Sequence, residues 1–154
     1  GPRDKGGNLV SWDVSAFEKR LFGGGFAAET LGIELDHAEA GMCRIQLPFK
    51  ASFSRGDGLI HGGVIGSLID NVGAAAVWTY DDIDWSSARG VSIGFTVNFL
   101  QAAVSCDLIA ESRVVRRGRS VSVIDVEVSN AVGDLIATGT VTYRLNQRFD
   151  NPNT

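Results

Sequence analysis

The fold is decided by residues 59–78, which read LIHGGVIGSLIDNVGAAAVW. Apolar side chains recur there at helical spacing and form one face of a predicted helix: Val64, Ile65, Leu68, Ile69, Val72 and Ala76. Small residues occupy another side, and a helix that is apolar on most sides is usually buried within a fold. Its length and its glycine content do not fit a membrane span. We therefore expect a long central helix that the rest of the chain covers.

Asp70 is the one residue in this stretch that carries a formal charge at pH 7. Burying a lone carboxylate carries a large desolvation cost unless a hydrogen bond or a cation satisfies it. The sequence leaves two interpretations open, a structural carboxylate that caps or pairs and a functional carboxylate that takes part in chemistry.

The beginning of the predicted helix has a second chemical feature. Its first turn leaves backbone N–H groups without partners, and the helix dipole adds partial positive charge. Gly62 and Gly63 have no side chains, so a ligand oxygen can come close to these donors. Such an end suits an anion, or an oxygen that gains negative charge during a reaction. His61 is either a structural hydrogen-bonding residue or a part of the same site.

Composition limits the classes of function. The length of 154 residues fits one domain with a full core, and the net charge of -4 argues against broad nucleic-acid binding. We find no signal-peptide pattern and no segment that would cross a bilayer, so we expect no membrane association. Cys43 and Cys106 form no disulfide or CxxC pattern, which favours a cytoplasmic protein. The few histidines and cysteines lie far apart, so we expect no metal site.

The domain is expected to occupy residues 8–146. Residues 1–7 open with the Gly-Pro pair typical of a cleaved expression tag and are left out of the fold. Residues 147–154 are predicted to be a frayed tail.

One short helix and six strands are predicted around the long helix. The short helix covers residues 12–22, with Ser11 or Asp13 as its cap and three glycines at its end. A turn at residues 37–40 joins the first two strands, and residues 50–59 and 81–89 are predicted to be loops. The predicted strands cover residues 30–36, 41–48, 91–99, 107–116, 120–129 and 135–145.

Residues 91–99 have a strict period of two. Strict alternation places Val91, Ile93, Phe95, Val97 and Phe99 on one face, and the opposite face then carries Ser92, Gly94, Thr96 and Asn98.

This order of elements predicts an α+β fold in which an antiparallel sheet curls around one long helix. A single helix covers only part of one sheet face, so we expect a second copy of the chain to cover more of it, as a homodimer or as a dimer of dimers.

The order of elements resembles the hotdog fold, and the resemblance covers residues 11–145. His61-Gly62-Gly63, with Asp70 nine residues after the histidine, resembles the PaaI-like acyl-CoA thioesterases of the phenylacetic-acid degradation type. Residues 90–93 and residues 137–139 are similar to strands of that family.

The resemblance implies hydrolysis of an acyl-CoA thioester without a metal or an organic cofactor. It implies that Asp70 is the general base or the nucleophile and that the Gly62 amide binds the thioester carbonyl. Ser92 would stand near the attacking water. His61 is expected among the catalytic residues, and Gly63 among the residues that bind the substrate.

Arg55 departs from the family pattern, which has asparagine six positions before the histidine. If Arg55 faces the site, its charge favours acyl groups that carry a carboxylate or another acceptor, because a buried guanidinium needs a partner. Asp57 in the same loop could supply a different polar contact.

Spacing along the helix adds a constraint. Gly62 and Asp70 are eight residues apart, which is about 12 Å along a helix axis. One thioester group does not reach both, since reactive contacts need about 3 Å. We therefore expect the two groups to come from two antiparallel copies of the helix, with Gly66 and Gly73 permitting their close approach.

Three arginines form a basic turn in this acidic protein: Arg116, Arg117 and Arg119. They are either an ordinary solvated turn or a contact for the phosphates of CoA. Trp78 and Trp85 are expected to pack in the core or an interface.

Two other functions compete with thioester hydrolysis. A hotdog dehydratase or hydratase needs an acid–base pair, and His61 and Asp70 lie too far apart on one helix to form it. A non-catalytic acyl-CoA or acyl-carrier binding protein is the second alternative, and Arg55 is the feature that keeps it open.

Overall fold

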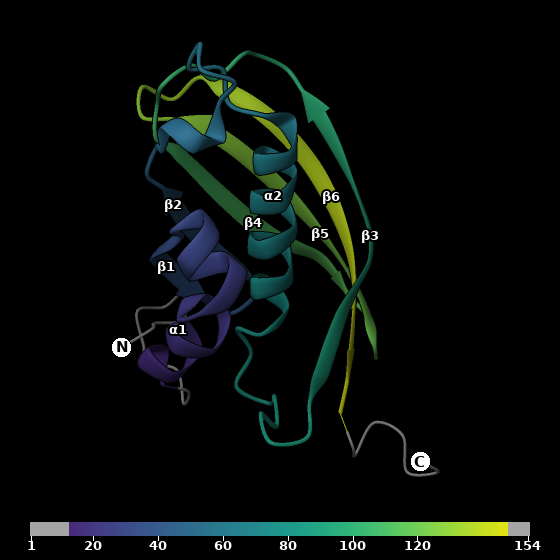
Figure 1. The fold of residues 1–154 in the computed structure, drawn as a ribbon. Helices are drawn as coiled ribbons and strands as arrows, with labels where there is room; N and C mark the ends of the chain where they lie inside the picture. The colour runs from purple at the N-terminus through teal and green to yellow at the C-terminus, as the bar shows by residue number, and fades with distance from the viewer. Residues whose placement is uncertain (1–12, 148–154) are drawn as a thin grey trace.

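The computed structural model describes residues 13–147, so residues 1–7 of the predicted tag and residues 148–154 of the predicted tail lie outside the described part of the chain. A six-stranded antiparallel sheet curves around the helix α2, with strand order β1-β2-β4-β5-β6-β3 (Figure 1). This arrangement confirms the predicted α+β class and the hotdog architecture. The helices and strands are α1 (Val14–Phe22), β1 (Glu34–Glu39), β2 (Met42–Leu47), α2 (Gly62–Val77), β3 (Arg89–Phe99), β4 (Leu108–Arg117), β5 (Val121–Asn130) and β6 (Leu135–Asn146).

The α1 helix forms where its apolar period and its cap predict it. The backbone N–H of Ser15 donates to the Asp13 carboxylate at 2.8 Å, and Gly23 ends the helix. Phe17 and Phe22 are buried on the inner face. Of the two predicted caps, Asp13 is the one used, and Ser11 lies outside the described residues.

The first hairpin differs from its prediction. Phe26–Leu31 form a π-helical turn that ends at Gly32, so the strand predicted from residue 30 begins only at Glu34. The predicted turn at residues 37–40 is wrong, because β1 continues to Glu39 with Ala38 buried. The chain reverses at Gly41, whose φ of 78° suits a residue without a Cβ.

The long helix is buried as its apolar pattern predicts. Ile65, Leu68, Ile69, Val72 and Ala76 are each at most 3% exposed. They pack against inward-facing side chains of the sheet, among them Ile45, Leu108, Ile124, Val126 and Val141. Burying a side chain of this size contributes about 1.5–3 kcal/mol.

Two glycines let α2 lie unusually close to the sheet. A Cβ on Gly73 would stand 2.5 Å from the Val141 side chain, and a Cβ on Gly139 would stand 2.8 Å from that of Ile69. Gly66 faces Phe95 and Val97 of β3 in the same way, at ordinary contact distance. Gly66 and Gly73 therefore allow side chains of the chain's own sheet to pack closely against α2. The expectation that they receive a partner helix is wrong.

Buried hydroxyl groups tie α2 to its surroundings. Ser112 of β4 donates to the Val72 carbonyl at 2.7 Å, which joins the sheet to the middle of the helix. Thr79 donates to the Ala76 carbonyl and accepts the N–H of Gly41, which joins the helix end to the first hairpin. These bonds hold the helix in register with the strands.

The β3 strand forms one edge of the sheet, and its outer side has no strand partner among the described residues. Gln147, the first residue of the predicted tail, is buried and accepts the backbone N–H of Asp84. None of the helices within residues 13–147 is long and apolar enough to cross a lipid bilayer.

Replacing Gly73 with alanine should lower the free energy of unfolding by about 1–3 kcal/mol, the usual cost of overpacking a core. The new methyl group would collide with Val141, which outweighs the gain of about 1 kcal/mol in helix propensity. Urea denaturation checks this. Gly63→Ala is the matched control, because a Cβ there meets nothing within 4 Å. Equal stability changes in both variants would contradict the close packing.

Candidate active site

Asp70 and Ser92 form the centre of the candidate site. Asp70 stands on the half-buried side of α2, and Ser92 stands on β3. The Ser92 hydroxyl donates to Oδ1 of Asp70 at 2.5 Å. The second carboxylate oxygen, Oδ2, has no hydrogen-bond donor among residues 13–147, so it remains open to a ligand or to water.

A β-bulge aims Ser92 at the helix. Ser92 pairs with Tyr143 and Gly94 pairs with Thr142, so Ile93 is the extra residue in β3. Beyond it Phe95 lies against α2, on the side to which Ser92 also points. The prediction of strict alternation, which put Ser92 on the face opposite Phe95, is wrong because the bulge reverses the order.

Tyr143 completes the surroundings of the carboxylate and was not predicted as a site residue. It is 6% exposed, and its hydroxyl accepts a hydrogen bond from the Trp78 indole at 3.0 Å. Burial raises the pKa of the Tyr143 hydroxyl, the Trp78 hydrogen bond lowers it, and the nearby Asp70 charge raises it. A Cβ on Gly90 would stand 2.0 Å from this hydroxyl, so only glycine leaves room for it. Gly90 pairs with Leu145 and Tyr143 pairs with Ser92, so no pattern in the sequence signalled the contact between Gly90 and the Tyr143 hydroxyl.

The beginning of α2 presents backbone donors at the surface. His61 is the N-cap residue, and its carbonyl accepts the N–H of Val64 at 3.0 Å. Gly62 and Gly63 are exposed and lie in the first turn, where a helix supplies no acceptor for N–H groups. Space beside Gly63 is open, whereas the Phe99 ring covers Gly62 on one side.

The carboxylate and the first-turn donors remain apart within one chain. They are eight residues apart on a continuous helix, which corresponds to about 12 Å. Each chain therefore carries two separate parts of a site on the same element.

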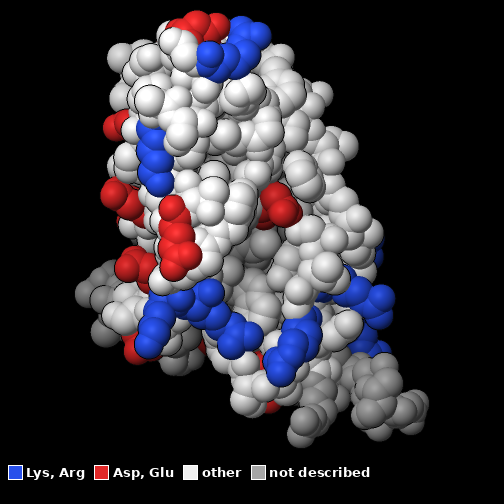
Figure 2. Space-filling view, in the orientation of Figure 1, with Lys and Arg blue, Asp and Glu red and all other residues white. Residues whose placement is uncertain are grey.

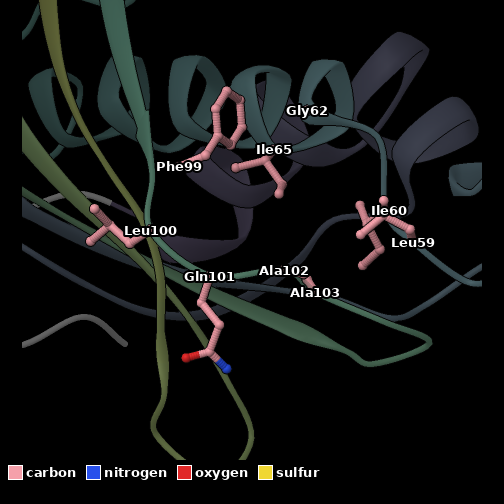
Figure 3. A pocket seen from close by; sticks show the side chains of 9 residues that line it. All are labelled: Leu59, Ile60, Gly62, Ile65, Phe99, Leu100, Gln101, Ala102 and Ala103. Atoms are coloured by element: carbon pink, nitrogen blue, oxygen red, sulfur yellow. The ribbon is translucent and has the colours of Figure 1, made fainter.

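An apolar pocket of about 420 Å³ adjoins Gly62 (Figure 3). Its walls come from the loop before α2, the first turns of α2 and the chain that follows β3. It lies beside the helix donors rather than beside Asp70.

Arg55 is directed away from this pocket. Its side chain is 60% exposed and donates to the Asp57 carboxylate at 3.0 Å, and the lining of the pocket does not include it. The Leu59 N–H and Arg55 together lower the pKa of Asp57, with the backbone bond as the larger cause. The guanidinium of Arg55 thus has its hydrogen-bond partner within its own loop.

The basic turn divides into residues with different surroundings. Arg117 donates two hydrogen bonds to Asp82 and lies 3.7 Å from the centre of the Tyr80 ring, so it holds the β4–β5 turn against the loop after α2. Arg116 and Arg119 are exposed on the same turn. Their contact with phosphate stays a prediction.

The tryptophans pack as expected. Trp78 is 5% exposed and lies 5.0 Å from Trp85 between ring centres, and the Arg20 guanidinium lies over both rings. Within residues 13–147, no group of three His, Cys, Asp or Glu side chains is placed to hold a metal ion.

The surface over α2 and β3 is nearly uncharged, and Lys and Arg side chains gather at its lower end (Figure 2). Large apolar side chains are exposed along and after β3: Val91, Ile93, Phe95, Phe99, Leu100 and Val104. An apolar surface of this extent on a sheet edge marks a contact site.

Comparison with known proteins identifies the family to which this chain belongs. The model of the thioesterase superfamily matches residues 57–137, which include α2, β3, β4 and β5. A Saccharolobus solfataricus protein with the provisional name of esterase is 31% identical over 105 residues, covering 68% of this chain and 72% of its own. Human acyl-coenzyme A thioesterase 13 is 26% identical over 115 residues, covering 73% of this chain and 79% of its own.

Among solved structures, the Escherichia coli PaaI protein from the phenylacetic acid degradation operon superposes with a TM-score of 0.73 at 21% identity, covering 84% of this chain and 91% of its own. This likeness confirms the hotdog fold. The chain belongs to the thioesterase superfamily, and its class of activity is thioester hydrolysis.

Replacing Arg55 with asparagine should leave the order of preference among acyl-CoA substrates unchanged, because Arg55 is exposed and paired with Asp57. Hydrolysis rates for paired acyl-CoAs with and without a terminal carboxylate check this. A shift of the variant toward neutral acyl groups would place the arginine in the site.

Proposed function

We propose that the protein hydrolyses acyl-CoA thioesters as a homodimer, with Asp70 as general base and the Gly62 amide as the donor to the thioester oxygen. The observation that carries the proposal is the Ser92–Asp70 hydrogen bond, which engages one carboxylate oxygen on the half-buried side of α2 and leaves the other without a donor among residues 13–147. Membership of the thioesterase superfamily and the name of the human relative support the acyl-CoA substrate.

The reaction needs few groups. Oδ2 of Asp70 accepts a proton from water, whose oxygen attacks the thioester carbonyl carbon. Negative charge builds on the carbonyl oxygen, where the Gly62 N–H at the positive end of the helix dipole stabilises it. The C–S bond then breaks, the carboxylic acid is released, and the proton held by Asp70 passes to the CoA thiolate. A thiolate is a good leaving group, so no separate strong acid is required.

Ser92 has a positioning role in this scheme. Its hydroxyl fixes one carboxylate oxygen and leaves the other for water, so the base enters the reaction in one orientation. Tyr143 and Trp78 close the space behind the carboxylate, because both are buried and joined by a hydrogen bond.

The outer edge of β3 supports the homodimer. Antiparallel pairing with a second β3 would satisfy its backbone groups and cover the apolar side chains that now face solvent. A two-fold axis there would bring the two α2 helices together in opposite directions.

The least buried stripe of α2 fits such a contact. It consists of Gly63, Ser67, Asp70, Asn71 and Ala74, which recur at helical spacing. Ser67 and Asn71 donate to carbonyls of their own helix, so the stripe has short side chains with satisfied donors. In an antiparallel pair, Gly62 of one chain would lie near Asp70 of the other, which removes the separation of about 12 Å.

The non-catalytic alternative makes the opposite prediction for Asp70. A pure binding protein would bind acyl-CoA without releasing thiol, and substitution of the carboxylate would then change only binding. This alternative was kept open because Arg55 replaces the asparagine of the family pattern, and the exposed pairing of Arg55 with Asp57 leaves that difference in place.

Replacing Asp70 with asparagine should lower kcat by about 100-fold or more, the usual contribution of a general base. The amide keeps the shape and can still accept the Ser92 hydrogen bond, so folding should be retained. Steady-state release of free thiol, with thermal melting, checks both expectations.

Asp81→Asn is the matched control, because it makes the same chemical change on an exposed loop residue and should leave kcat unchanged. A folded Asp70→Asn protein with near wild-type kcat would contradict the proposed function.

A further inference from the structure

We propose that the apolar pocket beside Gly62 binds the acyl group and selects uncharged, apolar acyl chains, with Phe99 and Ala102 as residues that set their size. The inference rests on the proposed acyl-CoA hydrolysis and adds the substrate class to it. The pocket has a volume of about 420 Å³ and is lined entirely by described residues.

The walls of the pocket come from two stretches that are distant in sequence, residues 59–65 and residues 99–103. Leu59 and Ile60 lie on the loop before α2, and Ile65 lies on the helix itself. Phe99 ends β3, and the short chain after it contributes Ala102 and Ala103. Figure 3 shows the Phe99 ring beside Ile65 at the helix, with Leu59 and Ile60 across the space from them.

The position of the pocket connects it to the reaction. Gly62 is one of its walls, so a carbonyl oxygen bound to the Gly62 N–H stands at the pocket's rim. The acyl chain and the sulfur leave the carbonyl carbon in different directions. With the sulfur toward solvent, where CoA must extend, the acyl chain enters the apolar space.

The chemistry of the lining excludes a charged acyl group. None of the nine lining residues is acidic or basic, and the one polar side chain, Gln101, points away from the space in Figure 3. Arg55 is paired with Asp57 instead of facing the pocket. A terminal carboxylate would therefore lose its hydration without gaining a partner, which is costly.

The volume of the pocket sets an upper limit on the size of the acyl group, and this limit lies well above the smallest acyl groups. An engineered cavity of about 150 Å³ takes up one benzene molecule, so 420 Å³ leaves room for a ring or for a chain of several methylenes. Each methylene that becomes buried should raise kcat/KM by about fourfold until the space is filled.

Phe99 sets one wall of this space. Its ring lies so close to α2 that a Cβ on Gly62 would be 2.9 Å away, and yet the residue is 59% exposed. A smaller apolar residue at position 99 would widen the pocket without removing a core side chain. Ala102 is exposed on the opposite part of the lining, so a larger residue there would narrow it.

The test compares kcat/KM for acetyl-, butanoyl-, hexanoyl-, octanoyl- and succinyl-CoA. The wild type should gain activity along the straight-chain series, and butanoyl-CoA should exceed succinyl-CoA by at least tenfold, although both have four carbons. Ala102→Phe should move the optimum to shorter chains, and Phe99→Leu should move it to longer chains.

Ala131→Phe is the matched control, because it adds the same ring to the exposed β5–β6 turn and should leave the profile unchanged. Opposite shifts of the optimal chain length in the two pocket variants, with unchanged elution in gel filtration, would support the inference. Misfolding would instead lower kcat/KM for all substrates together. Hydrolysis with no dependence on chain length, or with succinyl-CoA equal to butanoyl-CoA, would overturn the acyl pocket and leave the proposed function intact. Failure of the wild type to hydrolyse any of the five thioesters would overturn both.

Discussion

The close approach of α2 to strands β6 and β3 is the constraint on which the rest of the structure depends. Gly73 and Gly139 leave no room for a side chain between helix and sheet. At that separation the Asp70 carboxylate comes within hydrogen-bond reach of a serine on the edge strand. Methyl groups at these two glycines would push the helix outward and separate Asp70 from Ser92. The packing of the core and the Ser92–Asp70 hydrogen bond therefore both depend on the short distance between α2 and the sheet.

The bulge at Ile93 converts this packing into a site. A regular strand would send Ser92 away from the helix, whereas the bulged strand places it on the same side as the apolar residues that follow. Bulges are common beside active sites because they redirect one side chain while the strand continues. The same strand then carries Phe99 to the front of the helix, so β3 serves both the carboxylate of its own chain and the pocket beside Gly62.

Periodic patterns account for what could be predicted from the sequence. The apolar spacing of α2 gave its buried face correctly, and the alternating strands gave the antiparallel sheet, because both patterns reflect burial over many residues. The bulge in β3 and the π-helical turn before β1 were missed, since each depends on one extra residue that leaves no periodic trace. The contacts of Gly73 with Val141 and of Tyr143 with Trp78 were missed because each joins residues that are distant in sequence. The expected roles of His61, Gly63 and Arg116 remain predictions.

The central claim is that each active site combines Asp70 of one chain with Gly62 of another, and co-expression of two differently tagged chains tests it most directly. Gly62→Pro removes the N–H donor at the first helical position, where the φ of proline suits a helix, and the added Cβ requires only a shift of the Phe99 ring. Pairing an Asp70→Asn chain with a Gly62→Pro chain should retain about half of the wild-type activity, because one site keeps both groups. Pairing a doubly substituted chain with a wild-type chain should abolish activity, because each site then lacks one group. The reverse result, an inactive first pair and a half-active second pair, would show that each chain carries its own complete site and would contradict the account.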